Sequence, residues 1–328
     1  MNRIAFHIDE SEDGLSIKQF LRGKLSFSMR QISRIKYRPD GFLVNETPQW
    51  VNFVLHTGDK LEFSLDDAEN ETAPDEELRG KAESASTPPC PENAPAVLYE
   101  DPYILIADKP AGMVSHPSHG HREDSALTLL EAGRGRLYLI GRLDKDTSGV
   151  LLFAKQRETA SVLARRRSDR IQKVYLAAVH GIPEPTSGEI RDSIGIEREF
   201  PLKMKIDPES GKEAVTRYET LFSGSLNENA QELVFPHTQE PVFPHAQKPV
   251  FSLLRIQLEH GRTHQIRVHL ASAGHPLLGD RLYGKGDHFP YARLHAARIL
   301  LIHPYTGKQL IVRSEPPEWA SPVAPAFF

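Results

Sequence analysis

Short apolar runs separated by polar turns recur along the chain and predict strands. Residues 137–140 and 150–154 are two such runs, and both are rich in β-branched and aromatic side chains. The polar segment between them, residues 141–149, holds two aspartates, an arginine, a Thr-Ser pair and glycine. Such residues suit a plain turn, and they equally suit a site held by a rigid sheet. The pattern by itself leaves both interpretations open.

Apolar residues near the N-terminus recur at helical spacing. They predict one helix within residues 15–25, with Ser16 as its candidate cap. A second short helix is predicted over residues 29–35, opened by Ser28. Two strands then follow, at residues 41–45 and 60–63.

The later apolar runs predict a larger unit made mostly of strands. Its first two strands flank the Asp101-Pro102 turn, and a helix is expected to begin near Leu127. After the central pair of strands, the expected elements are a helix at 159–167 and strands at 171–179 and 250–258.

Residues 231–251 contain a short repeat with a period of eight residues. The period is too short, and the copies too few, for a solenoid. Its frequent prolines exclude a central strand or a helix, so we expect a duplicated surface hairpin tip that leads into the strand at 250–258. His237 and His245 are interpreted as products of the duplication rather than as metal ligands.

Charge divides the chain into two units. Residues 66–95 hold nine acidic and two basic side chains and many prolines, so this segment carries −7 while the rest carries +3, against −4 for the whole chain. A length of 328 residues also favours two or three units. We therefore predict a small domain at residues 1–66, an acidic linker at 67–95 and a large domain at 96–328.

The composition also bounds the cellular setting. No apolar run approaches the roughly 20 residues that span a membrane, and the first residues lack the apolar stretch of a signal peptide. Cys90 is the only cysteine, which excludes an internal disulfide framework and a site with several thiolate ligands. We expect a cytoplasmic protein with no membrane partner, and a monomer.

The small N-terminal domain carries a run of one charge sign. Seven bases and no acid lie between Lys18 and Arg38, which is typical either of a solvated helix face or of a phosphate-binding surface. The order of helix, Ser-x-x-Gln-Ile, Phe-Leu-Val-Asn and Gly-Asp-Lys-Leu-Glu-Phe resembles the S-four-type RNA-binding domain, although residues 37–41 form a longer turn than usual. The resemblance implies RNA-binding roles for Lys18, Arg22, Arg30, Arg34 and Lys36.

The segment at residues 258–270 admits three interpretations. His260, His264 and His269 could form a zinc cluster, but no neighbouring acid is placed as in the His-Glu-x-x-His pattern. The segment could instead be a helix capped by Thr263 that only packs. In the third interpretation, arginines of this segment recognise an anion; they are Arg262 and Arg267.

The central polar segment also resembles the start of a calcium-binding loop, Asp-x-Asp-x-Ser-Gly. However, the twelfth position of that loop is Lys155, where a bidentate glutamate is needed, and a strand follows rather than a helix. The sequence therefore does not favour calcium, and we expect no metal site.

Four motifs occur together in one order: Asp-Lys-Pro-Ala-Gly from Asp108, Arg-Leu-Asp-x-x-Thr-Ser-Gly-Val-Leu-Leu-Phe-Ala-Lys from Arg142, Lys-x-Tyr from Lys173, and Gly-Arg-Thr-His-Gln-Ile-Arg-Val-His from Gly261. They closely resemble the RluA-type family of pseudouridine synthases. The resemblance implies an α+β protein whose catalytic domain has a mixed, largely antiparallel sheet flanked by helices and loops. Gly141 departs from the histidine usual before Arg-Leu-Asp, and the effect on local contacts stays open.

The same resemblance implies the roles of individual residues. Asp144 matches the family's catalytic aspartate, and Arg142 matches the arginine beside the flipped nucleotide. Tyr175 matches the tyrosine that stacks on the target base, and Arg267 matches the arginine that pairs with the aspartate. Such a carboxylate can act as a nucleophile at the sugar or as a base, and the sequence does not choose between them.

The expected activity is isomerisation of specific uridines in structured RNA, with ribosomal RNA of the large subunit favoured over transfer RNA. Because no electron or group is transferred to another molecule, the expected cofactor is none. Two other classes stay open: a non-catalytic RNA-binding protein on the same fold, and a metal-dependent hydrolase that uses the histidines at 260–269. The sequence does not identify the uridine or the RNA.

Overall fold

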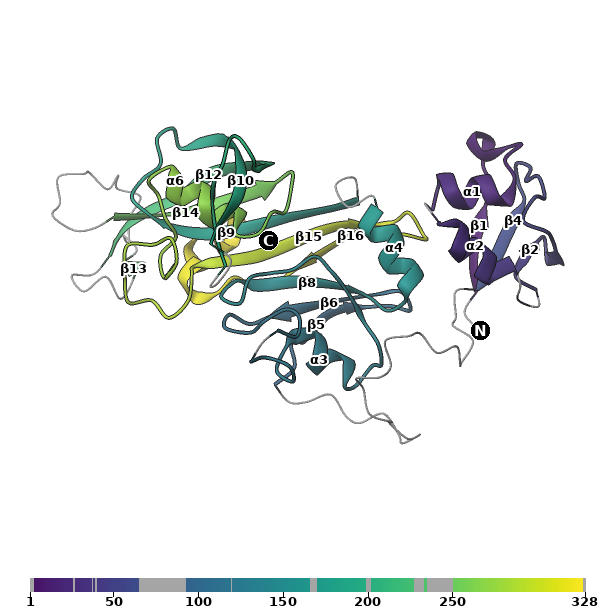
Figure 1. Ribbon diagram of the computed structural model, residues 1–328, viewed down its shortest axis with the longest axis horizontal. Helices are drawn as coiled ribbons and strands as arrows, with labels where there is room; N and C mark the ends of the chain where they lie inside the picture. The colour runs from purple at the N-terminus through teal and green to yellow at the C-terminus, as the bar shows by residue number, and fades with distance from the viewer. Residues whose placement is uncertain are drawn as a thin grey trace.

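The computed structural model describes residues 3–25, 27–36, 38, 40–64, 93–118, 120–165, 170–198, 202–226, 233–234 and 250–326. Within them the chain is an α+β protein in which two β-sheets are accompanied by a few short helices (Figure 1). Most of the predicted linker at 67–95 and of the repeat at 231–251 lies outside the described residues. None of the helices in the described ranges is long and apolar enough to cross a membrane.

The first sheet is small and antiparallel, in the order β1-β4-β2-β3. Two helices pack on it around Phe20 and Phe63, which are both fully buried. The predicted caps are confirmed, because the hydroxyls of Ser16 and Ser28 each accept a hydrogen bond from the backbone three residues later. The elements are β1 (Arg3–His7), the 3₁₀ helix η1 (Glu10–Glu12), α1 (Ile17–Gly23), α2 (Met29–Lys36), β2 (Phe42–Val44), β3 (Thr47–Pro48) and β4 (Lys60–Ser64).

The second sheet is large and mixed, in the order β11-β10-β12-β14-β9-β15-β8-β6-β5, with β13, β16 and β7 paired at its sides. Its pairs are antiparallel except for β8 with β15. The strands are β5 (Ala96–Glu100), β6 (Ile104–Lys109), β7 (Tyr138–Ile140), β8 (Ser148–Ala154), β9 (Ile171–His180), β10 (Ser187–Arg198), β11 (Lys203–Ile206), β12 (Lys212–Leu226), β13 (Leu233–Val234), β14 (Val250–Leu258), β15 (Leu294–Ile302) and β16 (Gln309–Arg313). The helices are α3 (Ala126–Glu131), α4 (Arg157–Arg165), α6 (Gln265–Ser272) and the 3₁₀ helix η3 (Glu318–Ala326).

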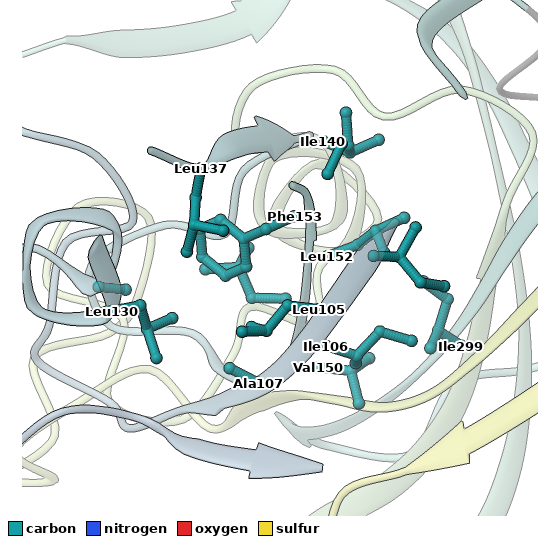
Figure 2. Close-up of a cluster of buried hydrophobic side chains, with 14 of the residues drawn as sticks. Leu105, Ile106, Ala107, Leu130, Leu137, Ile140, Val150, Leu152, Phe153 and Ile299 are labelled. Atoms are coloured by element: carbon teal, nitrogen blue, oxygen red, sulfur yellow. The ribbon is translucent and has the colours of Figure 1, made fainter. Parts of the chain in front are cut away.

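The predicted central strand at 150–154 lies in the middle of the hydrophobic core. Val150 to Ala154 are all fully buried, and Figure 2 shows Leu152 and Phe153 among side chains from β6, β7, α3 and β15. Burying one such side chain contributes about 1.5–3 kcal/mol to folding. This packing makes β8 a rigid support for the polar segment that precedes it.

The parallel pair β8 and β15 fixes where that segment lies. Ser148 is opposite His295 and Gly149 is opposite Ala296. Gly149 has a φ of +104°, and a Cβ there would lie 2.3 Å from the carbonyl oxygen of Ala296, so only glycine fits. On the other side of β15, Ala296 pairs with Tyr175 of β9. The register therefore brings the start of β8 close to Tyr175, which is distant in sequence.

One helix differs from its expectation. The helix after residue 260 is not capped by Thr263: it begins at Gln265, and its N-cap is His264, which has a φ of +54° and makes no side-chain capping bond. Instead, the side chain of Gln265 reaches back and accepts a hydrogen bond from the backbone of Arg262. His264 is also one of the residues that line the site described below.

Candidate active site

The polar segment before β8 forms a loop that buried side chains hold in place. The hydroxyl of Ser115 accepts a hydrogen bond from the Leu143 backbone N–H at 3.1 Å and donates one to the Leu143 carbonyl at 2.7 Å. The loop starts at Gly141, whose φ of +78° is a conformation that glycine adopts at no steric cost. Glycine at this position therefore suits the backbone of the loop.

Lys109 holds the same loop through hydrogen bonds to backbone carbonyl oxygens. Its side chain is fully buried, and its ammonium donates to the carbonyl oxygens of Pro110, Met113 and Lys145 at 2.8, 2.6 and 3.1 Å. Burial lowers the pKa of Lys109 to about 7, although the charge of Asp144 opposes this shift. Lys109 belongs to the Asp-Lys-Pro-Ala-Gly motif but had no predicted role, and in the structure its ammonium joins two loops.

Asp144 extends from this loop with about a quarter of its side chain exposed. Two nitrogen atoms face the same carboxylate oxygen: Arg267 Nη1 donates to Oδ2 at 3.3 Å, and His264 Nε2 lies 3.8 Å from it. The described residues provide no hydrogen bond to the other oxygen, Oδ1. The contacts at Oδ2 thus orient the carboxylate, whereas Oδ1 is available to a bound molecule.

Arg267 is fixed by a second carboxylate that sequence analysis did not identify. Its Nε and Nη2 donate to the two oxygens of Asp280 at 2.7 and 2.8 Å, and the Asp280 side chain is fully buried. Burial opposes the positive charge of Arg267, but the hydrogen bonds and charge of Asp280, together with Asp144, raise its pKa. The guanidinium therefore stays charged between two carboxylates.

A cavity of about 220 Å³ opens over Asp144. Its lining comes from the loop before β8, from β9 and β14, and from the segment around α6. The structure thus brings together five residues that sequence analysis assigned to one site: Arg142, Asp144, Tyr175, Arg262 and Arg267. The cavity is more polar than apolar, which suits a ligand with several hydrogen-bonding groups.

Two of the three histidines of the zinc interpretation contact different groups. Both ring nitrogens of His269 are within hydrogen-bonding distance of other groups, the Thr216 hydroxyl at 2.9 Å and the Asp192 carbonyl at 3.3 Å. His264 faces Asp144 instead. No group of three or more potential metal ligands occurs among the residues that the structure describes.

The predicted basic surface of the small unit lies on its two helices. Lys18 and Arg22 are on α1 beside a hollow, whereas Arg30, Arg34 and Lys36 are on α2. Arg34 also contacts the large unit, because its Nη1 lies 3.5 Å from Oε1 of Glu158 on α4. In Figure 1, α4 is the helix of the large unit nearest to the small sheet.

A protein-family match and individual relatives of this chain point to the same class of enzyme. The family described as RNA pseudouridylate synthase matches residues 103–272. A Bacillus subtilis protein described as the uncharacterized RNA pseudouridine synthase YjbO is 29% identical over 90% of this chain and 93% of its own length. The ribosomal large subunit pseudouridine synthase D of Zymomonas mobilis is 35% identical over 70% of this chain and 71% of its own length.

A solved structure shares the fold. Human RNA pseudouridylate synthase domain containing 1 superposes with a TM-score of 0.54 and 24% identity, covering 73% of this chain and 89% of its own. The similarity agrees with the expected α+β fold, in which helices and loops flank a mixed, largely antiparallel sheet.

Proposed function

Since this chain belongs to the RNA pseudouridylate synthase family, we propose that Asp144 supplies the carboxylate with which it isomerises uridine to pseudouridine. The observation that carries the proposal is the position of Asp144 in the lining of the polar cavity, with one oxygen facing Arg267 and His264 and the other without a hydrogen bond in the described residues. A carboxylate arranged in this way is charged, oriented and accessible.

The reaction needs such a group. The bond from the sugar to the base nitrogen breaks, the base rotates, and the sugar is joined to a base carbon. That carbon then loses a proton and the released nitrogen gains one, so no other molecule is consumed. Asp144 acts either as a nucleophile at the sugar or as a base that removes a sugar proton.

The other residues around the cavity suit the handling of a flipped nucleotide. The target base must leave its stack before Asp144 can reach the sugar. Tyr175 lines the cavity and provides an aromatic face on which the base stacks. Arg142 and Arg262 lie at the exposed rim, where their positive charges attract the phosphates on either side of the nucleotide.

The proposed substrate is ribosomal RNA of the large subunit, because relatives that are 33–35% identical are described as ribosomal large subunit pseudouridine synthase D. The test is a map of pseudouridines in total RNA from cells with and without this gene. We expect deletion to remove pseudouridine from large-subunit ribosomal RNA, and the parent chain to restore it. Loss confined to transfer RNA would contradict the assignment of the substrate.

The small N-terminal unit is proposed to be an S-four-type RNA-binding domain that uses the bases of α1 and α2. Each phosphate contact contributes about 0.7 to 0.9 to the slope of log affinity against log salt concentration. Replacing Lys18 and Arg22 together with glutamine should therefore weaken RNA binding and flatten the slope by about 1.5. The measurement is RNA affinity at several salt concentrations.

The matched control replaces two exposed lysines of the large unit, Lys212 and Lys308, with glutamine. This variant should keep a slope close to that of the parent. If the Lys18 and Arg22 variant also keeps the parent slope, the surface of α1 does not bind RNA.

A further inference from the structure

We propose that Tyr283 is a positioning residue that holds His264 in one tautomer, with the ring proton on Nε2 and directed at Asp144. The consequence for catalysis rests on the proposed role of Asp144, whereas the tautomer itself does not. Tyr283 lies in the loop between α6 and β15, and no motif identified in the sequence pointed to it.

Two polar groups contact the Tyr283 hydroxyl and favour one direction for its proton. The backbone N–H of Met204 donates to the hydroxyl oxygen at 2.8 Å, so that oxygen already serves as an acceptor. The only other polar atom that the described residues place within hydrogen-bonding distance of the hydroxyl is Nδ1 of His264, at 2.9 Å. Among the described residues, Nδ1 is the acceptor available to the hydroxyl proton, so we infer that the hydroxyl donates to Nδ1.

A neutral imidazole has one protonated nitrogen and one acceptor nitrogen. Because Nδ1 accepts from Tyr283, the proton of His264 is on Nε2, which lies 3.8 Å from Oδ2 of Asp144. This tautomer directs an N–H dipole at the carboxylate, whereas the other tautomer would direct a lone pair at it. The two contacts of the ring thus favour the same tautomer.

The environment keeps the ring neutral. Burial lowers the pKa of His264, although the charge of Asp144 opposes this shift. The other charged groups near the ring are Arg267 and Arg142, which also lower the pKa, and Asp280, which raises it. In a doubly protonated ring Nδ1 could no longer accept, and the Tyr283 hydroxyl would have to turn its proton away from the ring.

The backbone of His264 is consistent with a residue held for its side chain. Its φ of +54° lies in the left-handed region, which costs a non-glycine residue about 1–3 kcal/mol unless its surroundings impose it. The rings of His264 and Tyr283 meet edge to face, with centroids 5.7 Å apart. The packing and the hydrogen bond together hold the imidazole toward the cavity.

Tyr283 also contacts the second donor to Asp144. The guanidinium of Arg267 lies over its ring, 5.2 Å from the centroid, at a distance typical of a cation–π contact. One aromatic side chain therefore supports both groups that face Oδ2. Because active-site hydrogen bonds are often long without substrate, the 3.8 Å separation is compatible with a bond that forms when RNA binds.

Nitrogen NMR of histidine-labelled protein tests the tautomer directly and needs neither RNA nor activity. His264→Gln removes one set of signals and so identifies those of His264. In the free parent protein at neutral pH we expect a protonated Nε2 and an unprotonated Nδ1. A proton on Nδ1, or a ring that is doubly protonated at neutral pH, would overturn the proposal whatever Asp144 does.

Tyr283→Phe tests the consequence, because it keeps the ring under Arg267 and removes only the hydroxyl. We expect the nitrogen signals of His264 to move toward a mixture of tautomers, and kcat to fall about tenfold with KM for RNA nearly unchanged. The matched control, Tyr218→Phe, also loses one hydroxyl hydrogen bond, to the Pro185 carbonyl, and should keep the parent signals and kcat.

Unchanged His264 signals in Tyr283→Phe would refute the positioning role. Altered signals with unchanged kcat would refute its importance to catalysis. Failure of the proposed function is a separate outcome, since it would appear as activity retained by an Asp144 variant while the His264 signals are as expected.

Discussion

Asp144→Asn is expected to form no detectable pseudouridine, a loss on the order of 10⁴-fold or more. Asparagine has nearly the same shape and still accepts a hydrogen bond from Arg267, but it carries no negative charge. Its amide can neither attack the sugar nor remove a proton from it. Because Asp144 is partly exposed and lies outside the hydrophobic core, we expect the variant to fold and to bind RNA about as well as the parent.

The measurement is pseudouridine formed per enzyme on the mapped RNA, together with melting temperature and RNA affinity. Asp146→Asn is the matched control, because both aspartates lie in the same loop and a plain turn would need them equally. This control should retain most of the activity. A folded Asp144→Asn variant that still forms pseudouridine would show that the catalytic assignment is wrong.

Arg267→Met is expected to reduce both stability and activity. The substitution removes the bidentate partner of Asp280 and leaves that carboxylate fully buried without its counter-charge. Breaking a buried ion pair in this way typically costs about 3–5 kcal/mol. Asp144 loses its nearest cation at the same time, so activity should fall by about 100-fold or more.

A second substitution separates the two losses. Replacing a buried ion pair with apolar side chains of similar volume is often neutral for stability. The double variant Arg267→Met with Asp280→Leu should therefore recover most of the free energy of unfolding, measured by urea denaturation, without recovering activity. If activity returns along with stability, Arg267 has only a structural role.

Local signals in the sequence identified many elements of the fold. The caps Ser16 and Ser28, the strand Val250–Leu258 and the buried run at 150–154 were all predicted, because periodicity and capping depend on residues only a few positions apart. The strands β10 and β12 were not predicted. Many side chains of β10 are exposed or half-exposed, so it lacks the apolar run that marks a buried strand.

The sequence by itself also determined the family, through four motifs in order, and with it five residues that line the candidate site. Which of them touch was decided only by the tertiary structure. Arg267 lies 123 positions from Asp144, and its closest partner is Asp280. His264 is directed at Asp144 by the hydroxyl of Tyr283. Such contacts depend on the register of a large sheet and on loops packed around it, and no short-range pattern in the sequence specifies that register.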